Sequence, residues 1–169
     1  RTAADLKGQV EFQDVTARYD GAGNPSLEHI TFTARPGQTI GIIGGTGSGK
    51  TTLVNLIPRL YDAADGKVLL DGVETGAYDL TSLRQAIGVV PQKAVLFKGT
   101  IRQNLLWGNA SATDSDLWEA LTVAQAKEVV EGKENGLDAP VEQGGVNFSG
   151  GQRQRLTIAR ALVRKPRIL

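Results

Sequence analysis

Residues 44–51, GGTGSGKT, combine glycines, a lysine and a hydroxyl in the spacing G-x-x-x-x-G-K-T. A polyphosphate is held by backbone N–H groups that point toward it, and glycines leave these groups uncovered. A helix that begins at the loop adds its positive end. We expect Lys50 to reach the β- and γ-phosphates and the Thr51 hydroxyl to serve as a Mg²⁺ ligand. The pattern predicts a nucleoside triphosphate site rather than an incidental glycine-rich turn, made by Gly44, Gly45, Thr46, Gly47, Ser48, Gly49, Lys50, Thr51 and Thr52.

A second glycine cluster, FSGGQRQR, occupies residues 148–155. Ser149 offers a hydroxyl, and Gly150 and Gly151 leave backbone N–H groups bare at the expected start of a helix, which is an anion-binding arrangement. The same letters also suit a helix cap that follows a turn. Taken with the complete phosphate loop upstream, the cluster favours a second contact with a nucleotide.

Strands and helices alternate around these clusters and predict an α/β fold. Val10, Phe12 and Val15 alternate with polar residues as in a half-buried strand, and residues 20–25 read as a turn. A strand at 39–43 should enter the loop, and a helix from 50 should kink or end early at Pro58. A short helix and a strand at 87–90 follow, then a mainly helical stretch at 93–130, where Thr113 and Asp116 resemble a capping pair. Ser149 should cap a last helix that ends near Lys165.

Composition excludes several classes of site. The 169 residues are 40% apolar and 22% charged, with a formal net charge of +1 and no cysteine, so disulfides and thiolate metal sites are excluded. No apolar run reaches the roughly 18 residues that cross a bilayer. The only histidine, His29, is expected on a surface or a strand. A basic run near the end of the chain reads as a solvated helix face rather than a nucleic-acid site: Arg153, Arg155, Arg160, Arg164, Lys165 and Arg167.

Together, four features make the chain resemble the nucleotide-binding domain of an ABC transporter of the exporter type. The loop is the first. The second is the cluster at 148–155, which resembles the family signature L-S-G-G-Q with Phe148 in place of leucine. The third is Gln92 in VVPQ, within a segment at 91–108 similar to exporters, PQKAVLFKGTIRQNLLWG. The fourth is Tyr19, at the end of the first strand.

The resemblance implies a role for each of these residues. Lys50 and Gln92 would be the catalytic side chains, Thr51 and Gln92 would contact Mg²⁺, and Tyr19 would stack on the adenine of ATP. In a head-to-tail pair of domains, the signature would cover the γ-phosphate of the ATP held by the partner, through Ser149, Gly150, Gly151 and Gln152. Residues 140–147, PVEQGGVN, resemble the exporter segment that contacts the membrane domain, although a solvated loop is an alternative.

The resemblance also implies the organisation of the chain. We expect a P-loop NTPase core with an N-terminal antiparallel β subdomain at residues 1–92, a helical signature subdomain at 93–165, and the start of the Walker B strand at 166–169. In the family that strand ends in an aspartate, and a glutamate that polarises water usually follows. On this reading the C-terminal part of the core and the general base are absent from the 169 residues, which belong to a longer polypeptide. We therefore expect the fragment to bind ATP without hydrolysing it.

The expected function is that of a motor domain at the cytoplasmic face of a membrane. Its partners would be a second ATP-binding domain, identical or homologous, and the membrane domain of the transporter, with no nucleic acid. Two alternatives are open. One is a soluble ABC-type ATPase, against which the exporter-like segment at 91–108 argues. The other is a non-hydrolysing half of an asymmetric pair.

Overall fold

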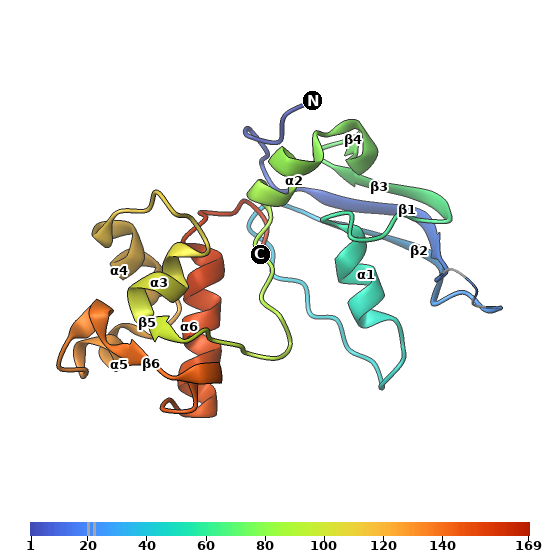
Figure 1. Ribbon diagram of the computed structural model, residues 1–169. Helices are drawn as coiled ribbons and strands as arrows, with labels where there is room; N and C mark the ends of the chain where they lie inside the picture. Colours follow the sequence, from blue (N-terminus) through green and yellow to red (C-terminus); the bar gives the residue numbers. More distant parts are fainter. Residues whose placement is uncertain (20, 22) are drawn as a thin grey trace. The chain divides into compact units, whose positions relative to one another are not determined.

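The computed structural model describes residues 1–19, 21 and 23–169, which form two compact units, Arg1–Ile87 and Gly88–Leu169 (Figure 1). The turn expected at residues 20–25 includes Asp20 and Ala22, which lie outside the described residues.

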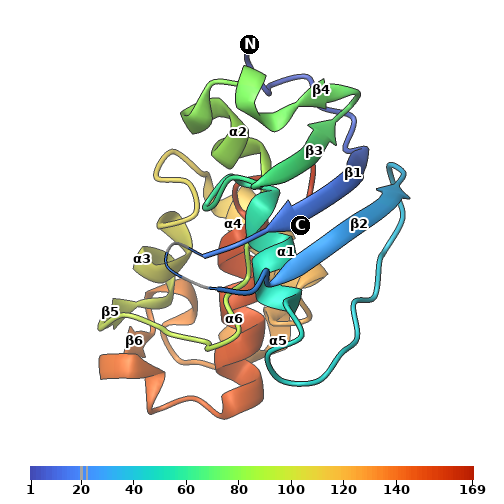
Figure 2. The ribbon, with the colours of Figure 1, turned by 90° about the vertical axis from the view of Figure 1, so that its right-hand side faces the viewer.

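The first unit is built on a four-stranded antiparallel sheet with the strand order β2-β1-β3-β4 (Figure 2). Its strands are β1 Val10–Ala17, β2 Leu27–Ala34, β3 Asp65–Leu70 and β4 Val73–Glu74. The predicted alternation in β1 is confirmed, because Val10, Phe12 and Val15 are all buried. Phe12 pairs in register with Phe32, and the two rings stack with their centroids 4.7 Å apart. His29 lies on β2 and is exposed, as expected.

Helix α1, Lys50–Leu56, follows the glycine loop directly and lies along one face of this sheet (Figures 1 and 2). It buries Leu53 and Leu56, and it ends before Pro58, as the position of the proline predicted. The 3₁₀ helix η1, Thr75–Ala77, and helix α2, Leu80–Ala86, complete the unit. The Asp79 side chain caps α2 by accepting a hydrogen bond from the Ser82 N–H.

Two predicted strands are not formed. Residues 39–43 have no regular structure, and the Ile43 side chain is 96% exposed; residues 88–90 are likewise irregular. In the described part of the chain, every ladder of strand hydrogen bonds is antiparallel. The ladders pair β1 with β2, β1 with β3, β3 with β4, and β5 with β6. An apolar segment becomes a strand only when a neighbour satisfies its backbone groups, and neither segment has such a ladder. The sequence shows the apolar run but not the missing neighbour.

The expected start of a strand at the chain end is reduced to one backbone contact. The Gly88 N–H donates to the Ile168 carbonyl oxygen at 2.7 Å, and the two segments are close enough that a Cβ on Gly88 would lie 2.8 Å from Pro166 Cγ. Leu169 is 64% exposed. The segment 166–169 therefore lies beside the irregular residues after Ile87 without forming a ladder.

The second unit is mainly helical, as predicted for this part of the chain. It contains α3 Ile101–Leu106, α4 Asp114–Val123, α5 Lys127–Glu131 and α6 Gly150–Leu162, with the 3₁₀ helices η2 Gly136–Asp138 and η3 Gln143–Gly145 and the paired strands β5 Gly99–Thr100 and β6 Pro140–Val141. The core forms where α3 and α4 pack against α6 (Figure 1).

Capping residues fix where these helices begin. The predicted pair of Thr113 and Asp116 forms a capping box at α4, and Thr100 with Gln103 forms another at α3. Helix α6 ends at Leu162, three residues before the predicted end at Lys165. Lys165 has a positive φ of 51°, which is incompatible with a continuing helix. Among the described helices, none is long and apolar enough to span a bilayer.

Candidate nucleotide-binding site

The glycine loop turns tightly between residue 43 and α1, and its glycines are needed for two reasons. Gly47 and Gly49 have φ angles of 79° and 91°, in the left-handed region that favours glycine. Gly49 also has no room for a side chain, because a Cβ would lie 2.5 Å from the Ser26 carbonyl oxygen and 2.7 Å from Leu27 Cδ2. At Gly44 a Cβ would meet Ser48 Oγ at 2.5 Å. The predicted loop residues therefore form one tight turn, and larger side chains at Gly44 or Gly49 would clash with their neighbours.

The Lys50 ammonium lies inside this turn. Its Nζ donates to the carbonyl oxygens of Gly44 at 2.6 Å and Gly45 at 2.8 Å, and to Ser48 Oγ at 3.2 Å. A positive charge is thus held beside the backbone of the loop, where an anionic group would meet it. Thr51 follows in the first turn of α1 and is exposed. A hard oxygen ligand and a cation beside an exposed glycine loop fit a Mg²⁺-bound polyphosphate.

Tyr19 is hydrogen bonded to Thr52 in the first turn of α1. The Tyr19 hydroxyl and Thr52 Oγ1 share a hydrogen bond of 2.5 Å, and Thr52 is buried while the Tyr19 side chain is 40% exposed. The Tyr61 ring packs against the Tyr19 ring at 89°, with the centroids 5.3 Å apart. Tyr61 was not predicted as a site residue, because it matches no motif and contacts Tyr19 only in the folded chain. A flat aromatic surface therefore stands beside the loop.

In the second unit, Ser149 caps α6. Its Oγ accepts from the Gln152 N–H at 3.2 Å, and Gln152 Oε1 accepts from the Ser149 N–H at 3.0 Å, which forms a capping box. Gly150 and Gly151 follow as the first two residues of the helix, and both are exposed. A Cβ on Gly151 would meet no atom within 4 Å. Two bare backbone groups therefore face open space at the positive end of a 13-residue helix.

Phe148 anchors this helix start in the core. It is 4% exposed and belongs to the hydrophobic cluster of the second unit, so the aromatic ring packs as an apolar side chain there. The Lys133 ammonium lies 4.6 Å from its ring centroid. Arg153 Nη1 donates to the Phe148 carbonyl oxygen at 2.7 Å and to that of Gly145 at 3.3 Å. These contacts hold the segment before Ser149 against α6.

The basic run near the end of the chain is not uniformly solvated. Arg153 is tied to the backbone as described, and the Arg160 guanidinium lies 5.5 Å from the Phe97 ring centroid, with Nη1 buried and without a hydrogen-bond partner among the described residues. Burial lowers the pKa of Arg160 below its usual value. The prediction of a solvated face is therefore wrong for these two residues, because the period of the helix turns them toward the body of the unit.

Gln92 lies in the irregular segment before β5, is exposed, and belongs to the second unit. The structure thus brings together Tyr19, the loop and Thr52 in the first unit, and the four signature residues in the second. Residues 140–147 run from β6 through η3 toward Ser149, with Val146 68% exposed.

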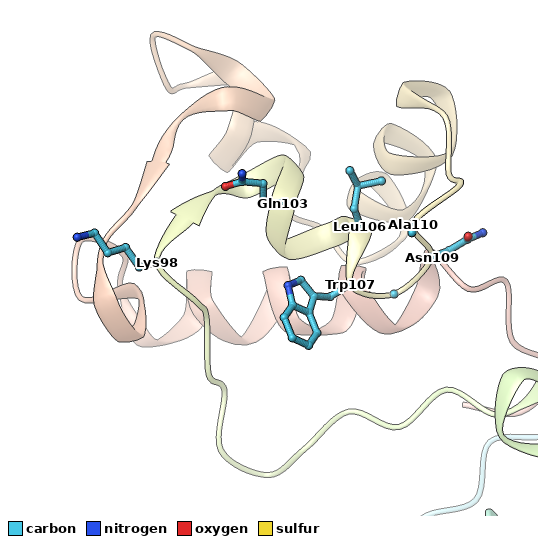
Figure 3. A pocket seen from close by; sticks show the side chains of 7 residues that line it. Lys98, Gln103, Leu106, Trp107, Asn109 and Ala110 are labelled. Atoms are coloured by element: carbon cyan, nitrogen blue, oxygen red, sulfur yellow. The ribbon is translucent and has the colours of Figure 1, made fainter. Parts of the chain in front are cut away.

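A surface hollow of about 610 Å³ lies beside Trp107 in the second unit (Figure 3). The Trp107 side chain is 71% exposed and stacks on Phe97 with the ring centroids 4.8 Å apart. The hollow is lined by Lys98, Gln103, Leu106, Trp107, Gly108, Asn109 and Ala110. An exposed, stacked aromatic pair of this kind is typical of a protein-binding surface.

Comparison with known proteins decides the family. A sequence model described as ABC transporter matches residues 27–169, which include the loop and the signature. The chain belongs to the ABC transporter family. Its architecture, an antiparallel sheet with helices, is that of an ABC ATPase with the P-loop NTPase fold, and its sequence is that of an exporter-type nucleotide-binding domain.

Members of the ABC transporter family from several bacteria are similar to the chain. An uncharacterized ABC transporter ATP-binding protein of Mycobacterium tuberculosis is 51% identical over 96% of this chain and 28% of its own length. The ATP-dependent lipid A-core flippase of Xanthomonas oryzae is 47% identical, with the same coverage. The solved structure of a bacterial Atm1-family ABC exporter with ATP bound matches 94% of this chain and 28% of that chain, at 35% identity and a TM-score of 0.86. The chain thus spans less than a third of the length of these proteins.

Proposed function

We propose that the chain is part of an ATP-driven motor domain of an exporter, in which ATP binding and hydrolysis are coupled to movement of a substrate across a membrane. One observation carries the proposal: a single chain holds both a complete phosphate loop and an open S-G-G-Q helix start. The similarity to a flippase and to an ATP-bound exporter supports it.

In the proposed site, Mg²⁺·ATP binds on the first unit. Lys50 and the loop glycines hold the phosphates, Thr51 contacts the metal, and Tyr19 stacks on the adenine. Gln92 is proposed as a further metal contact from the resemblance of its segment to exporters alone. The metal would screen charge on the phosphates. The chain's own contribution is to orient them by backbone N–H groups and by the Lys50 ammonium, which already lies against the loop.

The signature is proposed to act on a second domain. Gly150 and Gly151 are open to solvent and lie at a helix end that attracts anions. A head-to-tail pair, identical or homologous, would place this end on the γ-phosphate of the partner's ATP. Ser149 keeps its hydroxyl exposed beside them, and the box with Gln152 fixes its direction.

The membrane domain of the transporter is the second proposed partner, and the motor domain would lie at the cytoplasmic face of the membrane. Exposed apolar side chains on the second unit support such a contact: Val95, Phe97, Trp107 and Val146. Val146 belongs to the segment 140–147. We further propose the division into a β subdomain and core at 1–92, a signature subdomain at 93–165, and the start of the Walker B strand at 166–169.

The 169 residues alone are proposed to bind ATP without cleaving it. Phosphoryl transfer to water needs a group that orients the water as well as charge on the phosphates. Among the described residues, the polar partners of Lys50 are two carbonyls and a hydroxyl, with no carboxylate. No described group of three or more acidic or histidine side chains is placed to hold a metal ion.

Three measurements on the purified chain test the proposal. Equilibrium dialysis with labelled ATP and Mg²⁺ should give saturable binding that Lys50→Ala weakens. Sedimentation velocity should then detect association that depends on Mg²⁺·ATP, and phosphate release should stay at background. Absence of ATP binding would reject the proposed site, and steady phosphate release at a rate typical of an ATPase would reject the claim of inactivity.

A further inference from the structure

Tyr19 is held at two points, and only one of them belongs to the phosphate-binding helix. Its hydroxyl is hydrogen bonded to Thr52 on α1. Its ring is braced by Tyr61, which comes from the segment after α1, beyond Pro58. Both tyrosine side chains stay partly exposed, at 40% and 47%. A tyrosine that only filled the core would be buried at this contact, as Tyr78 is at 5%.

From this geometry we propose that Tyr61 is a positioning residue for the base of the nucleotide. It fixes the plane of the Tyr19 ring, so that the ring is oriented before the adenine arrives. The inference rests on the proposed function, in which Tyr19 stacks on the adenine, and it adds a residue to that site.

The perpendicular arrangement makes this role possible. In an edge-to-face pair, one ring presents its edge to the face of the other. If Tyr61 presents its edge, it covers one face of Tyr19 and leaves the opposite face free. If Tyr19 presents its edge, both of its faces stay free. In either case Tyr61 leaves at least one face of the Tyr19 ring uncovered, and the Tyr19 side chain as a whole is 40% exposed.

The tie to Thr52 makes the orientation relevant to the phosphates as well. Thr52 is adjacent to Thr51 and two residues after Lys50, within the first turn of α1. A ring fixed to Thr52 and Tyr61 therefore keeps a constant position relative to the loop. Binding then loses less conformational freedom of the Tyr19 side chain, which is the general advantage of a preorganised site.

The test compares two ligands that share phosphates and differ in the base. Isothermal titration calorimetry would measure binding of Mg²⁺·ATP and of Mg²⁺·tripolyphosphate to the 169-residue chain. The variants are Tyr61→Leu, Tyr61→Met, Tyr61→Phe, Tyr19→Leu and the double variant Tyr19→Leu/Tyr61→Leu. Leu60→Ala is the matched control, since Leu60 is a neighbouring side chain that is 50% exposed.

Tyr61→Leu and Tyr61→Met should weaken ATP binding about two- to tenfold, the range expected for loss of one edge-to-face contact. Tripolyphosphate binding should stay unchanged, Tyr61→Phe should retain ATP binding because the ring remains, and Leu60→Ala should match the wild type. In the Tyr19→Leu background, removing Tyr61 should cause no further loss, because Tyr61 acts through Tyr19.

Three results would overturn the inference while leaving ATP binding established. They are unchanged ATP affinity in both aliphatic variants, an equal loss for ATP and tripolyphosphate, and losses at the two tyrosines that simply add. A wild-type chain that binds neither ligand would instead reject the proposed function, and this inference with it. Thermal unfolding of each variant checks that folding is intact, and Tyr61→Met replaces Tyr61→Leu if the latter does not fold.

Discussion

Replacing Gly151 by alanine should make the chain more stable and its association with a partner weaker. Gly151 is the second residue of α6, its φ is not positive, and a Cβ there would meet no atom within 4 Å. Alanine at a helical position is favoured over glycine by about 0.5–1 kcal/mol. For a chain of this size the melting temperature should rise by about 1–4 °C, measured by differential scanning calorimetry without nucleotide.

The opposite effect is expected when a partner's ATP must approach the helix start. The added methyl group covers the backbone N–H that Gly151 leaves bare, and a hydrogen bond to a charged group contributes about 1.5–3 kcal/mol. A head-to-tail pair of identical chains would contain two such sites, so the dimer should be weakened by about 3–6 kcal/mol in total. Sedimentation velocity with Mg²⁺·ATP should then find monomer at concentrations where the wild type associates.

A matched control separates a local effect from a general one. A Cβ on Gly76 would likewise meet no atom within 4 Å, and the φ of Gly76 is not positive, but this residue lies in η1 of the first unit. Gly76→Ala should associate like the wild type. If Gly151→Ala also associates like the wild type, a partner's nucleotide does not lie against this helix end. If the melting temperature of Gly151→Ala falls below that of the wild type instead, a Cβ at position 151 does not have the free space inferred here.

Further predictions concern the loop and the sheet. Lys50→Ala should weaken Mg²⁺·ATP binding about 10- to 100-fold in equilibrium dialysis, from the loss of charge-assisted contacts, and leave the nucleotide-free melting temperature nearly unchanged, since the ammonium contacts only the loop. Gly49→Ala should lower the free energy of unfolding by about 2–6 kcal/mol in urea titrations, since left-handed backbone and overpacking each contribute about 1–3 kcal/mol; wild-type stability would contradict the loop geometry. The hydrogen bond that the protonated His29 Nδ1 donates to the Asp14 carboxylate raises the pKa of His29 above 6.5. The stabilisation from this pair is therefore complete below pH 6.5 and is lost as pH rises through the folded pKa. The melting temperature of the wild type should therefore approach that of His29→Gln between pH 6 and 9, and a constant difference would show that the pair contributes nothing.

Local signals in the sequence predicted the helices well. Helix starts are set by residues next to each other in the chain, and the expected caps at Thr113 and Ser149 are formed. The strands at 39–43 and 87–90 were wrong because a strand needs a hydrogen-bonding neighbour that may lie far along the chain. An apolar run records the tendency to be buried, not the identity of that neighbour.

The candidate site divides along the same line. The loop and the signature follow from spacing, because phosphate binding by backbone groups requires glycines at fixed positions. Tyr61 has no such pattern, and its contact with Tyr19 exists only once β1 and the segment after α1 are folded. The partial burial of Arg160 was missed for a related reason: an arginine in a basic run is expected to be solvated, and its contact with the Phe97 ring exists only in the folded chain.

The two glycine clusters differ in what makes glycine necessary, and the difference bears on function. At Gly47 and Gly49 the backbone itself has a positive φ, so the fold alone explains the residue. At Gly150 and Gly151 the backbone is helical, and only the far end of the Arg153 side chain comes within 4 Å of a built Cβ. There the fold would gain from alanine at either position. What glycine supplies at these positions is access to the backbone, and access has value only if something outside the unit binds there.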